Sequence, residues 1–321
     1  MYMINDFKNK TFLITGGFGF IGSHLVRRLL NLQANVVVFA RKSSSSWRLK
    51  DVLRNIKVYE IDIRDKMQVQ DMIKQIHPDY IFHLAAYGVN SANTDYMSAI
   101  ETNVLGTINI IQATKFIECR KIINIGSSSE YGNKTEPIQE DMVLTPVDIY
   151  GSSKAAATIL AHQIATDQNI NLITLRPFGI FGEGEESHKI FSYIILQVLQ
   201  GKNVDLTLCN QLRDYCYIDN IIDACILAIE HNSIQNEIFN IGSGEIHPLK
   251  HYVELLFKHL QTNKSPNYGA LPYRTNERWI PEPNINKIKT MLSWEPRISI
   301  EEGIIKTVNW YKHNAHLYLN A

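Results

Sequence analysis

The stretch TGGFGFIGSHL (15–25) decides the fold, because it joins a short apolar segment, TFLIT (11–15), to a longer amphipathic one. Its glycines stand at Gly16, Gly19 and Gly22. A strand that ends in such a turn and enters a helix places backbone amides where they can bind a pyrophosphate. Glycine suits these positions because the chain turns tightly and must approach the ligand closely. The stretch therefore predicts a dinucleotide-binding βα unit.

Further short apolar segments follow along the chain. They are NVVVFA (35–40), IKVYEI (56–61), YIFHLAA (80–86), KIINIG (121–126) and INLITLR (170–176). Such β-branched runs are typical of strands buried on both faces of a parallel sheet. The stretches between them, over 23–33, 64–76 and 99–117, carry apolar residues at helical spacing. The pattern predicts an α/β fold with a Rossmann-type doubly wound parallel sheet.

The alternation fades after about residue 178, where the chain becomes richer in proline, asparagine and aromatic residues. FNIGSGE (239–245) again has the pattern of a strand that enters a glycine turn. We predict a dinucleotide-binding domain over 1–178 plus about 207–241. A smaller, interleaved substrate domain would comprise 179–206 and 242–321.

The composition excludes several functions. With 32 basic and 32 acidic residues, the chain has no net field to attract nucleic acid or a membrane surface. The four cysteines contain no CxxC pair, so we expect neither a metal site nor a disulfide framework. The N-terminus lacks an apolar segment long enough for secretion, and no later segment reaches spanning length. We expect a cytoplasmic protein that binds small ligands.

Two motifs supply candidate catalytic groups. YGSSK (150–154) places Tyr150 and Lys154 on one face of a helix, where an ammonium would favour the phenolate of an acid–base tyrosine. GSSSEYG (126–132) follows the fifth strand, at the carboxyl edge where doubly wound sheets bind ligands. Each motif alone is common: chance produces Y-x-x-x-K, and serine and glycine simply end many strands.

Together and in this order, the three motifs resemble the extended short-chain dehydrogenase/reductase family, in its nucleotide-sugar epimerase, dehydratase and reductase branch. HLAA (83–86), LRPFGIFGEGE (175–185), RDYCYIDNIIDA (213–224) and MLSWEPRISIEEGI (291–304) extend the resemblance over nearly the whole chain. It implies that Ser127 polarises the reacting oxygen, that Tyr150 exchanges the proton, and that Lys154 tunes Tyr150 and holds the nicotinamide ribose.

The resemblance also implies the ligand contacts. The cofactor residues are Gly16, Gly19, Phe20, Ile21 and Gly22 in the turn, Asp62 and Ile63 at the adenine, and Leu84, Ala85 and Ala86 beside the cofactor. The substrate residues are Tyr87, Ser128, Ser129, Gly179, Arg213 and Arg274. The two arginines would meet the diphosphate or nucleoside, a role suited to a bidentate guanidinium, although either could instead form a surface ion pair.

The loop FARKSSSSWRL (39–49) stands where NAD-preferring members carry an acid that binds both ribose hydroxyls. Here the strand is followed by Ala40 and then by Arg41, Lys42 and Ser43. A guanidinium attracts a 2′-phosphate that a carboxylate would repel. The loop resembles the NADP-binding loop of GDP-mannose dehydratase relatives, so we predict NADP, with a solvated basic loop as the alternative.

Two departures from the family pattern bear on the reaction. Ser129 stands where 4,6-dehydratases carry the glutamate of the elimination step, and Glu130 is displaced by one residue, which argues against dehydration. Gly179 replaces an asparagine that binds the sugar nucleotide in many members. The first expectation is therefore NADPH-dependent reduction of a keto group, at C4 of a nucleotide-diphosphate 4-keto-6-deoxy sugar.

Other readings stay open. The first is an epimerase with tightly bound NAD(P), and a less favoured one is a 4,6-dehydratase. The chain could also be an NADP-binding regulator rather than an enzyme, but such a protein has no need of Ser127, Tyr150 and Lys154. Family members often form dimers through the helix that carries the Tyr/Lys pair and the one before it. The apolar residues of ATILAHQIA (157–165) are compatible with a homodimer.

Overall fold

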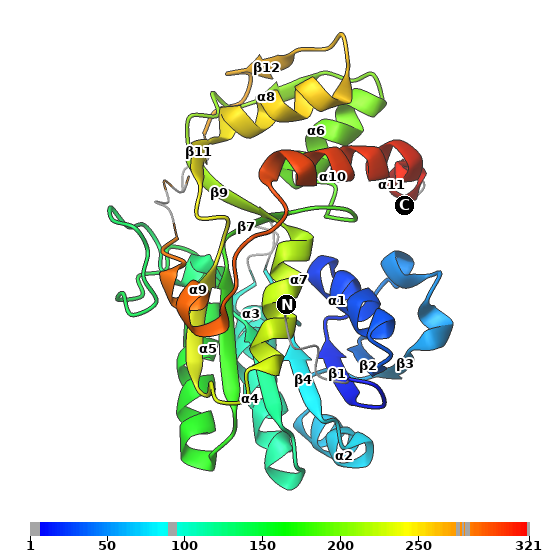
Figure 1. Ribbon diagram of the computed structural model, residues 1–321, viewed down its shortest axis with the longest axis vertical. Helices are drawn as coiled ribbons and strands as arrows, with labels where there is room; N and C mark the ends of the chain where they lie inside the picture. Colours follow the sequence, from blue (N-terminus) through cyan, green and yellow to red (C-terminus); the bar gives the residue numbers. More distant parts are fainter. Residues whose placement is uncertain (1–6, 89–94, 274–276, 278, 280–282, 320–321) are drawn as a thin grey trace.

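The computed structural model describes residues 7–88, 95–273, 277, 279 and 283–319. Within these residues, seven parallel strands form the main sheet, in the order β3-β2-β1-β4-β5-β6-β10 (Figure 1). The strands are β1 (Thr11–Thr15), β2 (Asn35–Ala40), β3 (Lys57–Glu60), β4 (Tyr80–His83), β5 (Lys121–Ile125), β6 (Leu172–Pro177) and β10 (Glu237–Ile241). Each predicted strand overlaps one of them, and the order is that of dinucleotide-binding sheets. The predicted Rossmann-type α/β fold is confirmed.

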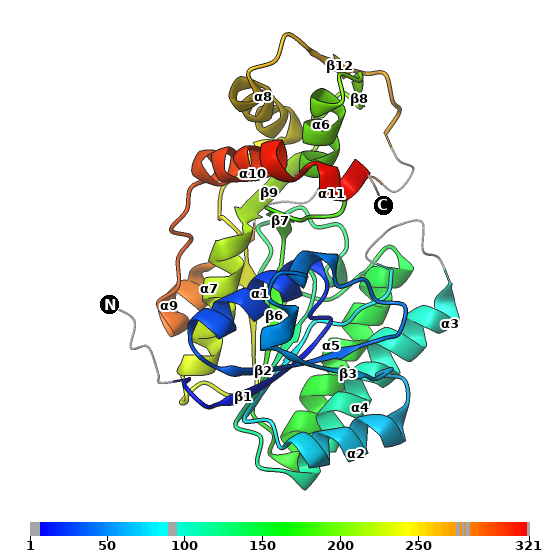
Figure 2. The same cartoon turned by 90° about the vertical axis from the view of Figure 1, so that its right-hand side faces the viewer.

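Helices cover both faces of the sheet (Figure 2). On one face, α1 (Phe20–Asn31) packs against α7 (Ile218–Glu230). On the other, α4 (Gly106–Ala113) lies between α2 (Lys66–Ile76) and α5 (Ile149–Gln168). Successive side chains of a strand point to opposite faces, so Phe12 and Ile14 join the core beneath α1, whereas Leu13 joins the core beneath α2 and α4. The sheet is buried on both faces, as its apolar strands predict.

The helices begin and end at residues suited to those positions. Asp65 caps α2, and its side chain accepts hydrogen bonds from the backbone N–H groups of Met67 and Gln68. Asp148 caps α5 in the same way through the N–H of Gly151. At the other end of α2, His77 takes the left-handed conformation that stops many helices.

The segment predicted as one helix over 99–117 is interrupted. It comprises α3 (Tyr96–Ala99), the π-helical segment η3 (Ile100–Leu105), α4 and the 3₁₀ turn η4 (Thr114–Phe116). Wider π turns often occur at functional sites. Here the π segment contains the buried Asn103, whose side chain hydrogen-bonds to two other parts of the chain. Apolar spacing alone cannot indicate this insertion.

A second group of elements lies at one end of the molecule, at the top of Figure 1. Its small sheets pair β7 (Gly179–Phe181), β9 (Leu212–Tyr217) and β11 (Ile246–Pro248), and separately β8 (Val204–Leu206) with β12 (Pro266–Tyr268). Its helices are α6 (Ile190–Leu199), α8 (Leu249–Leu260), α10 (Ile300–Asn314) and α11 (His316–Leu319), while α9 (Asn286–Leu292) lies beside the main sheet. The division into two domains stays a proposal. Strand β9, which that division gives to the nucleotide domain, pairs with β7 and β11.

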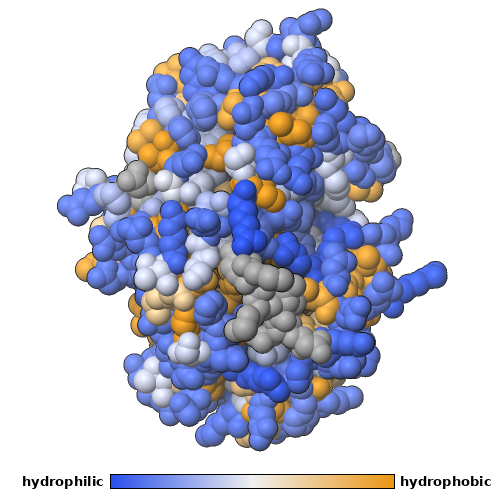
Figure 3. Space-filling model, in the orientation of Figure 1, coloured by the Kyte–Doolittle hydropathy of each residue, from blue (hydrophilic) through white to orange (hydrophobic). Residues whose placement is uncertain are grey.

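The face drawn in Figure 3 carries mostly hydrophilic residues, with hydrophobic ones in separate small patches. Among the described residues, no helix combines the length and apolar character needed to cross a membrane.

Candidate active site

The glycine turn between β1 and α1 is built by close backbone approaches. Gly16 has φ +71°, and a Cβ there would lie 2.8 Å from the backbone nitrogen of Ala85. A Cβ on Gly22 would lie 2.3 Å from the carbonyl oxygen of Gly16. Gly19, which has no side chain to cap the helix, stands at the N-cap of α1. This geometry fits a pyrophosphate bound at the helix N-terminus.

The end of β4 lies against the same turn. The Oγ1 of Thr15 accepts hydrogen bonds from the backbone N–H groups of Leu84 and Ala85, both at 3.2 Å. Thr15 also contacts the buried His83 at 2.7 Å, and burial lowers the pKa of this imidazole to about 3. His83 is therefore a neutral structural residue. The contacts place the predicted cofactor wall of Leu84 to Ala86 beside Gly16.

The loop that follows β2 shares a cavity with the end of β3. The cavity has a volume of about 530 Å³, and its lining residues are Arg41, Lys42, Ser43, Glu60, Asp62, Arg64 and Gln68. The predicted 2′-phosphate residues thus lie beside the predicted adenine contact Asp62. The guanidinium of Arg64 donates to Asp62 at 2.6 Å and lowers the pKa of that carboxyl group.

Sequence reasoning missed Arg64 and Glu60 in this cavity. Glu60 ends β3 and Arg64 follows it, each two residues from Asp62, and this position is the signal that could have identified them. Ile63, the other predicted adenine contact, is buried and packs against Gly106. A Cβ on Gly106 would come within 2.6 Å of the Ile63 Cδ1. The side chain of Asn109 holds the Ile63 carbonyl at 2.9 Å.

The serine loop after β5 packs on the first turn of α5. The turn η5 (Ser128–Glu130) is capped by Ser127, whose Oγ accepts a hydrogen bond from the N–H of Ser129 at 3.1 Å. A Cβ on Gly151 would lie 2.4 Å from the carbonyl oxygen of Ser129, so only glycine permits this approach. The contact brings the Ser127 loop to the helix turn that carries Tyr150.

Lys154 lies one turn further along α5 and is buried, with 2 % of its surface exposed. Its Nζ donates to the carbonyl oxygen of Ile125 at 2.6 Å, so the ammonium lies at the end of β5, directly before the Ser127 loop. Burial lowers the pKa of Lys154, and the Glu130 carboxylate opposes that shift. Tyr150 is partly buried, and its carbonyl accepts a hydrogen bond from Ser153.

Asn103 is a site residue that sequence reasoning missed. Its amide donates to the carbonyl of Tyr87 at 2.9 Å and to the Oγ of Ser153 at 2.8 Å, and its Oδ1 accepts from the N–H of Tyr87 at 2.7 Å. One side chain on η3 thus holds both the predicted substrate residue Tyr87 and the helix of the Tyr/Lys pair. No local pattern in the sequence indicates the π segment that directs Asn103 inward.

The remaining predicted substrate residues are placed as follows. Arg213 on β9 pairs with the carboxylate of Glu277. The sequence did not indicate this acidic partner. A Cβ on Gly179 would lie 2.4 Å from the Asp214 carbonyl oxygen and 2.6 Å from the Tyr215 ring, so the close packing of β7 on β9 requires glycine there. Ser128 and Ser129 belong to η5. Arg274 lies outside the described residues.

Comparison with known proteins identifies the family. The profile of the NAD dependent epimerase/dehydratase family matches residues 12–242. The chain belongs to this family. The predicted resemblance to the extended short-chain dehydrogenase/reductases is thereby confirmed, and the chain is an enzyme of this epimerase/dehydratase type.

Individual members of the epimerase/dehydratase family show which reactions occur among similar proteins. The UDP-N-acetyl-alpha-D-glucosaminuronate decarboxylase of Bacillus cytotoxicus is 30 % identical, over 94 % of this chain and 98 % of its own. The structure of UDP-glucose 4-epimerase from Thermotoga maritima, solved with UDP-glucose, has a TM-score of 0.89, 27 % identity, and coverage of 95 % and 99 %. UDP-glucuronic acid 4-epimerase from Bacillus cereus, solved with UDP-glucuronic acid and NAD, has a TM-score of 0.85, with the same identity and coverage.

Within this epimerase/dehydratase family member, Glu130 faces the protein interior. Its side chain is fully buried and forms an ion pair with Arg176 at 2.8 Å. The carboxylate of this displaced glutamate is therefore engaged by a buried guanidinium, and a reaction without dehydration stays a prediction. Among the described residues, no cluster of histidine, cysteine and acidic side chains could hold a metal ion.

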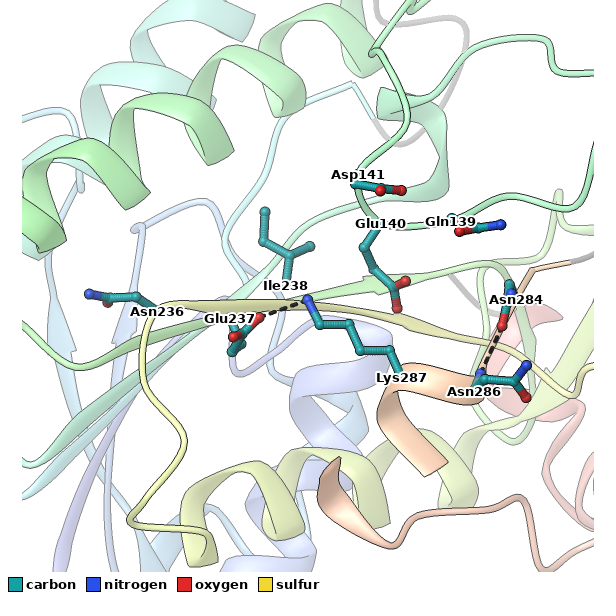
Figure 4. Close-up of a pocket in the computed structure, with 9 residues that line it drawn as sticks. All are labelled: Gln139, Glu140, Asp141, Asn236, Glu237, Ile238, Asn284, Asn286 and Lys287. Carbon is teal, nitrogen blue, oxygen red and sulfur yellow. Dashed lines mark hydrogen bonds and ion pairs between the residues drawn. The ribbon is translucent and has the colours of Figure 1, made fainter. Parts of the chain in front are cut away.

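A second polar cavity, of about 540 Å³, lies beside the edge strand β10 (Figure 4). Lys287 reaches from α9 to Glu237 at 2.7 Å, and the Glu140 side chain points toward the same strand. The cavity is lined by Gln139, Glu140, Asp141, Asn236, Glu237, Ile238, Asn284, Asn286 and Lys287, which include no predicted site residue.

Proposed function

We propose that this enzyme is a nucleotide-diphosphate-sugar epimerase that acts through transient oxidation of a sugar hydroxyl, at C4. The observation that carries the proposal is the packing of the Ser127 loop on the α5 turn of Tyr150, with Lys154 at the end of β5, directly before that loop. Acid–base groups so arranged suit an alcohol/carbonyl pair. Two similar solved structures are 4-epimerases. We therefore favour epimerisation over the keto reduction that the sequence first suggested.

The chain's own residues divide the work. Tyr150, as phenolate, would take the proton from the C4 hydroxyl, and Ser127 would donate a hydrogen bond to the same oxygen. The Lys154 ammonium would stabilise the phenolate. On the return step Tyr150 would give the proton back after the ketone has turned its other face. A bound nicotinamide would supply the hydride exchange, and the glycine turn with its α1 N-terminus fits that cofactor.

NADP remains the proposed cofactor, because Arg41, Lys42 and Ser43 line one cavity with Asp62. That observation also favours a second candidate, NADPH-dependent reduction of a 4-keto-6-deoxy sugar nucleotide. NADPH, the reductant of that reaction, carries the 2′-phosphate that these residues would bind. The proposed substrate in both cases is a nucleotide-diphosphate sugar, whose phosphates Arg213 and Arg274 would bind.

We further propose a homodimer formed through η3, α4 and α5. Exposed apolar side chains occur on two of these elements, which pack against each other: Ile100 and Leu105 of η3 are 40 % and 48 % exposed, and Ile159 and Leu160 of α5 are 60 % and 40 % exposed. Packing against a second copy would bury them. A stripe of this kind on neighbouring helices suits a helical-bundle interface.

The deciding experiment is stoichiometric. Desalted enzyme would be offered UDP-glucose or UDP-glucuronic acid, and separately a nucleotide-linked 4-keto-6-deoxyhexose with NADPH. We expect interconversion of a sugar with its C4 epimer and no net loss of NADPH. One NADPH oxidised per keto sugar would establish the second candidate instead. Release of water from an unmodified hexose nucleotide would contradict both.

The variant Tyr150→Phe tests the acid–base assignment. Removing only the hydroxyl should lower turnover about 100-fold or more and leave cofactor affinity nearly unchanged. Tyr96→Phe, at a tyrosine that is 68 % exposed on α3, is the matched control and should behave as wild type. Near-normal turnover in Tyr150→Phe would assign the proton transfer to another group.

A further inference from the structure

The Glu130 side chain folds back against the backbone of its own loop, which also carries Ser127. Its Oε1 accepts hydrogen bonds from the backbone N–H of Ser127 at 2.8 Å and from the Oγ1 of Thr158 at 3.2 Å. A Cβ on Gly126 would come within 2.6 Å of the same oxygen. The carboxylate therefore packs against the backbone of Gly126 and Ser127, and the loop needs glycine at position 126 to admit it.

The Lys154 ammonium binds the end of strand β5, directly before the same loop. Lys154 donates to the carbonyl of Ile125, two residues before the N–H that Glu130 accepts. The titratable groups that interact with Lys154 from the surrounding elements are His83 on β4 and Glu130 on η5, and Tyr150 lies four residues earlier on the same helix. His83 is neutral, because burial lowers its pKa to about 3. Glu130 thus supplies the negative charge that acts on the buried ammonium.

Arg176 on β6 holds the other carboxylate oxygen. Its Nε donates to Oε2 of Glu130 at 2.8 Å, and its Nη1 donates to the Tyr131 hydroxyl at 2.8 Å. Both side chains of the pair are buried, with 2 % and 0 % exposed. Burial raises the pKa of Glu130, whereas Arg176 and Lys154 oppose that shift. The guanidinium therefore favours the ionised carboxylate.

We propose that Glu130 is a positioning residue of the active site, whose buried carboxylate fixes the Ser127 backbone and places a negative charge beside the strand end that binds Lys154. The proposal rests on the acid–base roles proposed above for Ser127, Tyr150 and Lys154. It assigns to the displaced glutamate a role other than elimination. Glu130 acts through these residues and does not touch the sugar.

The two parts of this role are separable by substitution. Glu130→Gln keeps an oxygen that can accept from Ser127 but removes the charge. Glu130→Asp keeps the charge but withdraws the carboxylate by one methylene group from the Ser127 N–H. Thr158→Val is the matched control, because it removes a neighbouring hydrogen bond to the same oxygen and leaves the charge in place.

The first measurement does not depend on catalysis. Nitrogen-15 NMR of the lysine side chains would follow the titration of Lys154, with its signal assigned by its loss in Lys154→Met. We expect the midpoint to move to lower pH in Glu130→Gln and to stay at the wild-type pH in Glu130→Asp and Thr158→Val. An unchanged midpoint in folded Glu130→Gln would overturn the charge assignment, whatever reaction the enzyme performs.

The second measurement compares the turnover of the wild type and the variants. Its substrate is the sugar nucleotide that the stoichiometric assay identifies. We expect kcat of Glu130→Asp to fall about 10-fold to 100-fold with little change in KM, because a displaced Ser127 hydroxyl no longer meets the reacting oxygen. A kcat within twofold of wild type would overturn the positioning role. Glu130→Asp keeps both charges of the ion pair with Arg176. It therefore tests the positioning role even if Glu130→Gln fails to fold.

Discussion

At the scale of single residues, environment rather than identity sets each role. Lys154 and Lys42 carry the same side chain, but Lys154 is buried at the end of β5 whereas Lys42 is exposed in the loop after β2. Burial lowers the pKa of Lys154, and the Glu130 carboxylate opposes that shift. Lys42 lines an open polar cavity, where it can neutralise a phosphate. The two lysines therefore serve different proposed ligands for physical reasons.

Arg41 carries the prediction of cofactor choice. If its guanidinium pairs with the 2′-phosphate, Arg41→Ala should weaken NADP(H) binding by about 1.5–3 kcal/mol, the scale of a charge-assisted hydrogen bond. NAD(H), which lacks that phosphate, should be barely affected. Titrating both cofactors by calorimetry checks this, with the exposed Arg54→Ala as control. Equal losses for the two cofactors would show that the loop is not a phosphate clamp.

At the scale of elements, single close contacts position the helices and turns of the site. Gly151 lets the first turn of α5 lie on the Ser129 carbonyl, and Gly22 lets α1 lie on the glycine turn. Asn103 ties the π segment η3 to α5 through Ser153. The contacts of Gly151 and Asn103 join separate segments of the chain, so the spacing of a motif gives no sign of them, whereas Gly22 meets Gly16 within one motif.

Helix α2 offers a test of an element away from the site. Its N-cap Asp65 accepts two backbone N–H groups, and Asp65→Ala would leave them to water. We expect the free energy of unfolding to fall by about 1 kcal/mol, with turnover per folded molecule unchanged. Chemical denaturation measures this, and Asp71→Ala within the same helix is the control. A loss of activity greater than the loss of folded protein would contradict the assignment.

At the scale of the whole molecule, the sheet brings the parts of the site to one edge. The glycine turn, the end of β4 and the serine loop follow the carboxyl ends of the adjacent strands β1, β4 and β5. The second group of elements, with β7 and β9, stands above that edge (Figure 1). A nucleotide sugar would therefore lie between the two groups, as in other doubly wound sheets.

The proposed homodimer is tested at this scale. Light scattering after size-exclusion chromatography should give the mass of two chains for wild type. Ile159→Arg places a charge in the proposed interface and should raise the dissociation constant at least about tenfold. Leu199→Arg, on an exposed position of α6, is the control and should leave the dimer intact. A wild-type monomer at micromolar concentration would refute the proposal.

The sequence by itself determined the sheet, the glycine turn and the Tyr150–Lys154 pair. These features depend on local rules: β-branched runs form buried strands, glycine alone tolerates the tight turn, and four residues make one helical turn. The family followed from the order of the motifs, because the order along the chain is itself sequence information.

Only the tertiary structure decided the environment of those residues. Glu130 meets Arg176 across 46 positions, Arg213 meets Glu277 across 64, and Asn103 meets Ser153 across 50. The packing of Tyr215 leaves no room for a side chain at Gly179. Burial and charge pairing depend on which segments the fold brings together, and they set the pKa of a buried group. Local periodicity specifies the direction of a side chain within its element, but its partners come from the packing of distant elements.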